Sequence, residues 1–162
     1  MTDLIQKISS YNLFNYLLPG ILFSVALEKF GLVAFDHENL VIEAFVFYFI
    51  GLSISRFGSL ITEPILKKIK FLKFALYKDF ISASKKDPQI EIFSEANNTY
   101  RTLTSMIILL ILLKAYSEFE LLFPMLIAWR LWFLLVLLFI IFLYSYKKQT
   151  DYISKRINIS KD

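Results

Sequence analysis

The sequence predicts an all-α membrane protein with four transmembrane helices and a basic helical insert between the second and third of them. Three observations support this fold class. Hydrophobic residues make up 57% of the 162 residues, and the mean hydropathy is +0.57, which exceeds what soluble domains show. Apolar runs long enough to cross a bilayer, which takes about 20 residues, recur along the chain. Lysines and arginines gather in the connections on one side of these runs.

The first predicted span covers residues 8–27 and holds no charged side chain. We expect it to be retained as a transmembrane helix, because no small-residue cleavage site of a signal peptide follows it. Pro19 in its middle predicts a kink, since a proline removes one helical hydrogen bond. Asn12 and Asn15 precede this kink at helical spacing, which predicts a polar stripe on that half of the span.

The second predicted span, from about residue 40 to residue 62, has the small residues of a helix-packing surface. They recur at intervals of three and four, which lets another helix approach closely. We expect a helix seam or a pore lining from this set and its polar neighbours: Gly51, Ser55, Arg56, Gly58, Ser59, Thr62 and Glu63. A charge inside a span is costly, so Arg56 is either functional or extends to the headgroups. Both interpretations stay open.

Two further spans follow the insert. The third begins with the uncharged residues 102–113, and the fourth covers residues 124–146. Arg130 lies inside the fourth span, at the end of the bundle where Glu43, Glu118 or Glu120 can neutralise it. The chain is therefore expected to divide into spans one and two (1–63), the insert (64–100), spans three and four (101–146) and a tail (147–162).

The positive charges predict the orientation in the membrane. Of the 18 lysines and arginines, only Lys29 and Lys114 fall in the connections on the side opposite the insert, and Arg56 and Arg130 fall inside spans. Cytoplasmic connections carry an excess of these residues. We therefore expect a multi-pass protein whose insert, N-terminus and C-terminus are cytoplasmic.

The insert itself is predicted to contain two helices. Apolar residues recur at three- and four-residue steps from Ile65 to Phe80 with lysines between them, which predicts a basic amphipathic helix. Asp87 and Pro88 suit the N-cap and first position of a second helix. No glycine or proline follows for many residues, so this helix is expected to continue into the third span.

Lysines and aromatic rings interleave in the insert, as they do on surfaces that bind single-stranded nucleic acid. Cations follow the phosphates there, and rings stack on the bases. The candidate ligand-binding residues are Lys67, Lys68, Lys70, Lys73, Phe74, Tyr77, Lys78, Lys85, Lys86 and Arg101. Two other interpretations stay open: the basic helix lies on anionic lipid, or the rings form the insert's own core.

The sequence lacks the residues of common catalytic and metal sites. It has no cysteine, and His37 is the single histidine, so neither a thiolate site nor a histidine cluster can form. No glycine-rich phosphate loop, His-Glu-x-x-His motif or nucleophile elbow occurs. We therefore expect no enzymatic activity, no cofactor and no metal.

Two stretches carry a resemblance to a known family. YNLFNYLLPG at residues 11–20 and ISRFGSLITEP at residues 54–64, followed by the lysine-rich insert, resemble the small four-span membrane effectors of bacterial anti-phage defence, most of all those of the Hailong system. The resemblance covers the layout of the whole chain. It implies an oligomeric ion channel in the bacterial inner membrane, whose cytoplasmic crown binds oligodeoxyadenylate made by a partner nucleotidyltransferase. Loss of the bound DNA would open the channel and arrest growth.

Two functional hypotheses follow. The first is a homo-oligomeric channel, for example a tetramer, because thin bundles usually enclose a path by closing identical subunits into a ring. The inserts would then concentrate an anionic regulator at the cytoplasmic mouth, namely a single-stranded oligodeoxynucleotide. The second is a non-conducting sensor or scaffold whose insert binds lipid headgroups or a partner protein.

Overall fold

The structure, a computed structural model, describes residues 13–35 and 39–161, and every regular element within these ranges is a helix. The first helix joins a π-helical turn, η1 (Leu13–Leu17), to α2 (Leu18–Lys29). The second joins α3 (Leu40–Phe57), the π-helical turn η2 (Gly58–Thr62) and α4 (Glu63–Lys68). The others are α5 (Tyr77–Lys86), α6 (Gln89–Leu122) and α7 (Met125–Lys161). The all-α part of the predicted fold class is confirmed.

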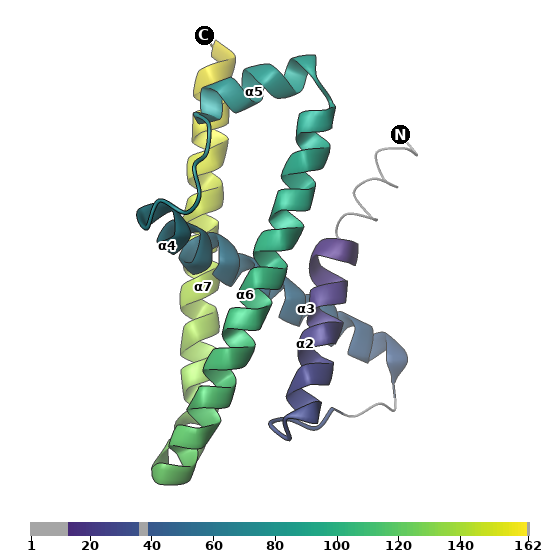
Figure 1. The fold of residues 1–162 in the computed structure, drawn as a ribbon, viewed down its shortest axis with the longest axis vertical. Helices are drawn as coiled ribbons and strands as arrows, with labels where there is room; N and C mark the ends of the chain where they lie inside the picture. The colour runs from purple at the N-terminus through teal and green to yellow at the C-terminus, as the bar shows by residue number, and fades with distance from the viewer. Residues whose placement is uncertain (1–12, 36–38, 162) are drawn as a thin grey trace.

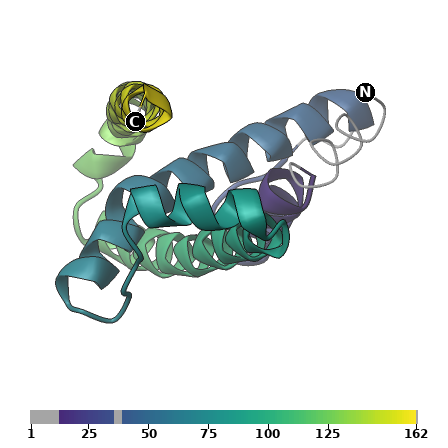
Figure 2. The same cartoon turned by 90° about the horizontal axis from the view of Figure 1, so that it is seen from above.

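The helices do not all run parallel to one axis. α6 and α7 form a long antiparallel hairpin with α2 beside α6, and α3 crosses behind α6 at a steep inclination (Figure 1). Seen from above, α7 is viewed end-on whereas α3 extends across the view (Figure 2). α5 lies across one end of this hairpin, where the ring of Tyr77 is 5.9 Å from the ring of Tyr152 on α7.

Two helices in the described ranges are long and apolar enough to cross a membrane, Leu40–Lys68 and Met125–Ile159. This finding is compatible with the predicted membrane protein. The helix that contains α2 is described only from residue 13, and the apolar half of α6 also carries Lys114, Glu118 and Glu120. The arrangement of four spans therefore stays a prediction.

The apolar half of α7 is hardly covered by the rest of the chain. The side chains of residues 131–137 are between 42% and 64% exposed, although all seven are hydrophobic, and they point in every direction around the helix. A helix that is apolar on all sides requires an apolar environment. The surface of this segment is therefore compatible with surroundings of lipid.

The small core lies where α2, α3 and α6 meet. Phe23, Leu27, Ile54 and Met106 are buried there and pack together. Each of the three helices contributes only one or two of these side chains, so this core is narrow for a chain of this length. The contacts around it consequently depend on close approach of the backbones and on polar side chains.

Glycines allow α2 and α3 to touch through their backbones. A Cβ atom at Gly51 would lie 1.7 Å from the carbonyl oxygen of Tyr16, and one at Gly20 would lie 1.8 Å from that of Phe47. Both distances are far below van der Waals contact, so no side chain fits at either position. A Cβ at Gly58 would lie 2.5 Å from Ser105 Oγ, so a side chain of α6 packs directly against η2 there.

Each of the first two helices contains a π-helical turn that ends two residues before a proline. η1 precedes Pro19 and η2 precedes Pro64. A proline lacks an N–H group and its ring crowds the carbonyl four residues earlier, and a widened turn relieves that crowding. The second helix consequently continues through Pro64 to Lys68 without a break.

The insert differs from the prediction in its first half. α4 ends at Lys68, residues 69–76 are not helical, and α5 begins at Tyr77, so the predicted helix over residues 65–80 is wrong. The helix ends because Lys70 adopts a left-handed backbone conformation with φ of 61°, and the N–H of Phe71 donates back to the carbonyl of Leu66 at 3.0 Å. The apolar spacing continues past this turn and misled the prediction.

The second predicted helix of the insert is confirmed. The carboxylate of Asp87 accepts a hydrogen bond from the N–H of Gln89 at 2.9 Å, which satisfies one of the free donors at the start of α6. α6 then runs from Gln89 to Leu122 without a break and joins the insert to the apolar hairpin.

Candidate functional site

Polar side chains from all the long helices meet where η1, η2, α6 and α7 come together. We call this set the polar cluster: Asn15, Ser59, Thr62, Glu63, Lys67, Arg101, Thr102, Ser105 and Lys148. Thr102 Oγ1 donates to Asn15 Oδ1 at 3.1 Å, and Ser105 Oγ lies 2.9 Å from Thr62 Oγ1. Asn15 is 1% exposed and Thr102 and Ser105 are fully buried. These pairs hold α6 to both π-helical turns.

Glu63 organises the charges of the polar cluster. Its carboxylate accepts hydrogen bonds from Lys67 Nζ at 2.7 Å and from Arg101 NH1 at 2.9 Å, and the residue is 7% exposed. Lys148 of α7 binds Ser59 nearby and interacts with this carboxylate electrostatically, so three cations share one carboxylate within the cluster. The resulting excess of positive charge attracts anions to this end of the molecule.

Lys148 supplies the hydrogen bond that Pro64 cannot make. In η2 the N–H of Glu63 donates to the carbonyl of Gly58, five residues earlier. In the same pattern the N–H of residue 64 would donate to the carbonyl of Ser59, but residue 64 is a proline and has no N–H. Lys148 Nζ lies instead 2.7 Å from the Ser59 carbonyl oxygen and 2.8 Å from Ser59 Oγ. This ammonium group therefore fastens α7 to the π-helical turn.

A pocket of about 400 Å³ opens beside the polar cluster. Its wall combines two cations and a carboxylate with four aromatic rings and three short polar side chains. The lining residues are Glu63, Lys67, Phe74, Ala75, Tyr77, Phe80, Ser94, Asn97, Asn98, Arg101 and Tyr152. Lys67 Nζ lies 3.9 Å above the centre of the Phe74 ring, a cation–π contact at the edge of this pocket.

The pocket has donors and rings that a ligand could use. Arg101 lines the wall with NH1 bound to Glu63, whereas its Nε, without a hydrogen-bond partner within the described residues, is buried and not open to the pocket. Asn97 and Asn98 offer amide groups from α6, one turn before Arg101. A ligand with an anionic group and a planar ring could therefore pair its charge with the cations of the wall and stack its ring on the aromatic side chains.

The structure divides the predicted ligand-binding residues into two groups. Lys67, Phe74, Tyr77 and Arg101 line the pocket. The others are exposed and do not line it: Lys68, Lys70, Lys73, Lys78, Lys85 and Lys86. Sequence reasoning missed Asn97, Asn98 and Tyr152. The two asparagines lie one turn before Arg101 on the same helix, which is a usable signal, whereas Tyr152 is brought in from the tail by the fold alone.

One predicted seam residue, Asn12, falls outside the described residues. The others lie near this site. Asn15, Ser59, Thr62 and Glu63 belong to the polar cluster. Gly51 and Ser55 are buried on α3. Arg56 is half-buried in the last turn of α3, and its functional role stays a prediction.

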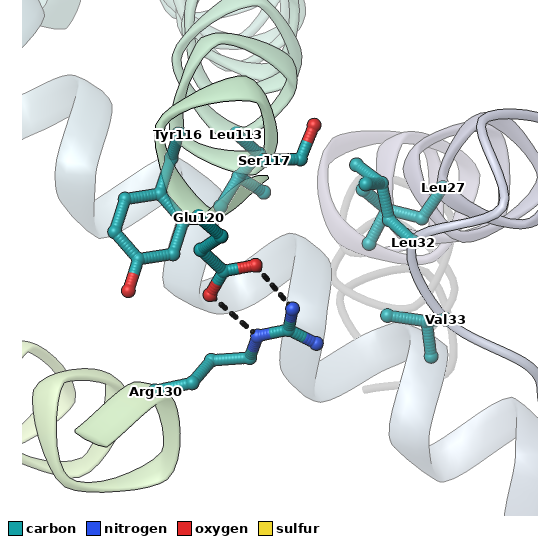
Figure 3. Close-up of a pocket in the computed structure, with 8 residues that line it drawn as sticks. All are labelled: Leu27, Leu32, Val33, Leu113, Tyr116, Ser117, Glu120 and Arg130. Carbon is teal, nitrogen blue, oxygen red and sulfur yellow. Dashed lines mark hydrogen bonds and ion pairs between the residues drawn. The ribbon is translucent and has the colours of Figure 1, made fainter. Parts of the chain in front are cut away.

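At the opposite end of the hairpin, an ion pair forms part of the lining of a second pocket of about 110 Å³ (Figure 3). Both carboxylate oxygens of Glu120 accept hydrogen bonds from Arg130, with 2.9 Å between Oε1 and Nε. Leu27, Leu32 and Val33 form the facing wall. The prediction that a glutamate neutralises Arg130 is confirmed. Because the two side chains pair with each other, although that of Arg130 is 53% exposed, we assign no ligand to this pocket.

No protein-family model, curated protein or solved structure matches this chain. The functional interpretation therefore depends on the geometry of the site and on the physical character of the helices.

Proposed function

We propose that this chain is a homo-oligomeric, channel-type membrane effector whose conduction is controlled by an anionic ligand. The ligand is a single-stranded oligonucleotide made by a partner nucleotidyltransferase, and the setting is anti-phage defence at the bacterial inner membrane. The observation that carries the proposal is the pocket, which combines Lys67 and Arg101 with Phe74, Tyr77 and Tyr152.

The placement in the membrane is supported by where the apolar segments end. Lys148 of α7 contacts Ser59 of η2, and the apolar half of α7 ends at Tyr146, just before Lys147. Asn15 and Thr102 are bonded to each other beside the same junction. We infer that a single membrane surface passes close to the polar cluster. The pocket, α5 and the tail then lie together on its aqueous side, the cytoplasmic one by the distribution of lysine.

The oligomer is supported by the exposed apolar surface of α7. The side chains of residues 131–137 are largely exposed, although Phe142 further along α7 stacks on Phe49 of α3. Identical subunits arranged in a ring would cover part of this exposed surface. In such a ring the pockets would surround the cytoplasmic mouth. Anionic ligands bound there would change the field that ions experience on entering.

Filter binding of short single-stranded DNA to the purified protein tests the ligand. We expect binding that weakens as salt is raised, because phosphate contacts release counterions. Lys67→Gln with Arg101→Gln should reduce the affinity at least tenfold, since both charge-assisted contacts are lost. Lys85→Gln with Lys86→Gln removes the same charge outside the pocket and should change it little. No binding even at low salt would overturn the proposal.

A second function is supported by the hydrogen bonds inside the polar cluster. Asn15, Thr102, Thr62 and Ser105 satisfy one another, which suits a rigid joint in a sensor or scaffold without a conducting path. Ion flux across liposomes separates the two functions. Flux in neither the ligand-free nor the DNA-bound state would favour the scaffold.

A further inference from the structure

The loop between α4 and α5, residues 69–76, exposes large apolar side chains to the surroundings. We call it the interfacial loop. Ile69 is 63% exposed, and Phe71 and Leu76 are each 74% exposed. Phe74 differs from these, because it lies under Lys67 and lines the pocket. The exposed apolar residues of the loop thus form a surface separate from the ligand pocket.

Three lysines outside the pocket accompany these apolar side chains. Lys68, Lys70 and Lys73 are exposed and alternate with them along the chain. The backbone turn at Lys70 directs the chain out of the helix: its φ is 61°, and the N–H groups of Phe71 and Leu72 donate to the carbonyl of Leu66 at 3.0 and 3.2 Å. The turn is therefore a formed structure that presents the loop, with its first donors satisfied.

The position of the loop fits the surface of a membrane. It begins where the candidate span Leu40–Lys68 ends. Its far end is also fixed near α7, because Tyr77 contacts Tyr152, six residues beyond Tyr146, where the apolar half of α7 ends. Both ends thus lie close to the level at which two apolar helices give way to polar residues.

We propose that the interfacial loop is an anchor in the headgroup region of an anionic membrane. Ile69, Phe71 and Leu76 enter the boundary of the acyl chains, and the neighbouring lysines contact lipid phosphates. The charge of the loop complements such a surface, and its apolar side chains match the layer beneath the headgroups. This inference rests on the proposed membrane placement of the chain and not on the proposed nucleic-acid ligand.

Tryptophan fluorescence of the full-length protein in lipid nanodiscs tests the anchor. Trp129 and Trp132 are replaced by phenylalanine, and one tryptophan is introduced per variant. Phe71→Trp reports on the loop, Leu134→Trp on the apolar half of α7, and Phe93→Trp on an exposed position in the aqueous part of α6. The lipid is phosphatidylcholine mixed with phosphatidylglycerol, with and without bromine near the carboxyl end of the acyl chains.

We expect Phe71→Trp to emit at shorter wavelength than Phe93→Trp and to lose roughly half of its emission in brominated lipid, because interfacial side chains lie about 5–10 Å deep. If Leu134→Trp is quenched but Phe71→Trp behaves like Phe93→Trp, the anchor is overturned and the membrane placement survives. If neither Leu134→Trp nor Phe71→Trp is quenched, the membrane placement itself fails.

The role of the lysines is tested in the Phe71→Trp protein. Lys70→Gln with Lys73→Gln should reduce the quenching in nanodiscs that contain phosphatidylglycerol but not in pure phosphatidylcholine. Lys85→Gln with Lys86→Gln, two exposed lysines of α5, is the matched control and should have no effect. An equal reduction in both lipids would contradict headgroup recognition. A blue-shift that disappears when single-stranded DNA is added would assign the loop to the nucleic acid instead.

Discussion

At the scale of single residues, the site depends on a carboxylate that occupies the cations a ligand would need. Glu63 binds Lys67 and Arg101 at once and is almost completely buried. The sequence indicated both cations and placed Glu63 on the helix seam, but it could not show that the three meet. Their contact joins residues 38 positions apart and depends on how α6 crosses η2.

Replacing Glu63 should have two opposite effects. Glu63→Gln leaves Lys67, Arg101 and Lys148 without their common counter-charge, so we expect a loss of stability of about 2 kcal/mol, in line with charge-assisted hydrogen bonds that are partly exposed. The same change frees both cations, so binding of single-stranded DNA should become tighter. Thermal unfolding in detergent and filter binding measure the two effects.

Glu95→Gln is the control for this prediction, because it removes the same charge from an exposed position on α6. It should leave stability almost unchanged and affect DNA binding less than Glu63→Gln does. Equal effects of the two variants would show that Glu63 contributes only its charge to the surface.

Gly51 should be intolerant of a side chain. The Cβ of Gly51→Ala would overlap the Tyr16 carbonyl, so η1 and α3 must move apart. The melting temperature should then fall by several degrees, reflecting about 1–3 kcal/mol of overpacking. Gly31→Ala is a useful comparison, since its Cβ meets nothing within 4 Å and the cost comes only from its φ of 68°. A smaller loss at Gly51 than at Gly31 would refute the backbone contact.

At the scale of elements, the helices that obey local rules were predictable and the junctions between them were not. Asp87 and Pro88 predicted the start of α6, and the structure confirms this prediction. The apolar spacing of residues 65–80 predicted one helix, but the left-handed turn at Lys70 breaks it. Lysine rarely adopts this conformation, so a lysine at position 70 does not predict the end of the helix. No short-range pattern in the sequence predicts that Lys148 binds a π-helical turn 89 residues away.

The contact between α7 and η2 can be tested by a double-mutant cycle. Lys148→Met removes the donor and leaves the Ser59 carbonyl unpaired, which should cost about 1–3 kcal/mol. Pro64→Ala restores a backbone N–H that can take over this carbonyl. The cost of Lys148→Met in melting experiments should therefore be clearly smaller in the Pro64→Ala background.

Lys147→Met, at the exposed neighbouring position, is the control for the cycle. Lys147→Met should reduce the stability only slightly, whether residue 64 is proline or alanine. Strict additivity of Lys148→Met and Pro64→Ala would mean that the ammonium group does not replace the missing N–H.

At the scale of the whole molecule, one end is polar and basic, and the other carries the Glu120–Arg130 ion pair. The distribution of lysine and arginine predicted this asymmetry, and the structure places the polar cluster, the pocket and the insert at the same end. The steep crossing of α3 was not predictable, because hydropathy gives the length of a span and not its inclination (Figures 1 and 2). The exposed apolar surface of α7 is what an oligomer in lipid would require.

Ion flux across proteoliposomes, measured with and without short single-stranded DNA on the side of the insert, tests the central claim most directly. We predict that the flux differs between the two conditions and that the difference disappears in the Lys67→Gln, Arg101→Gln protein, while the Lys85→Gln, Lys86→Gln protein behaves as the parent does. A flux that is absent in both conditions, or that DNA leaves unchanged in the parent protein, would contradict an anion-controlled channel.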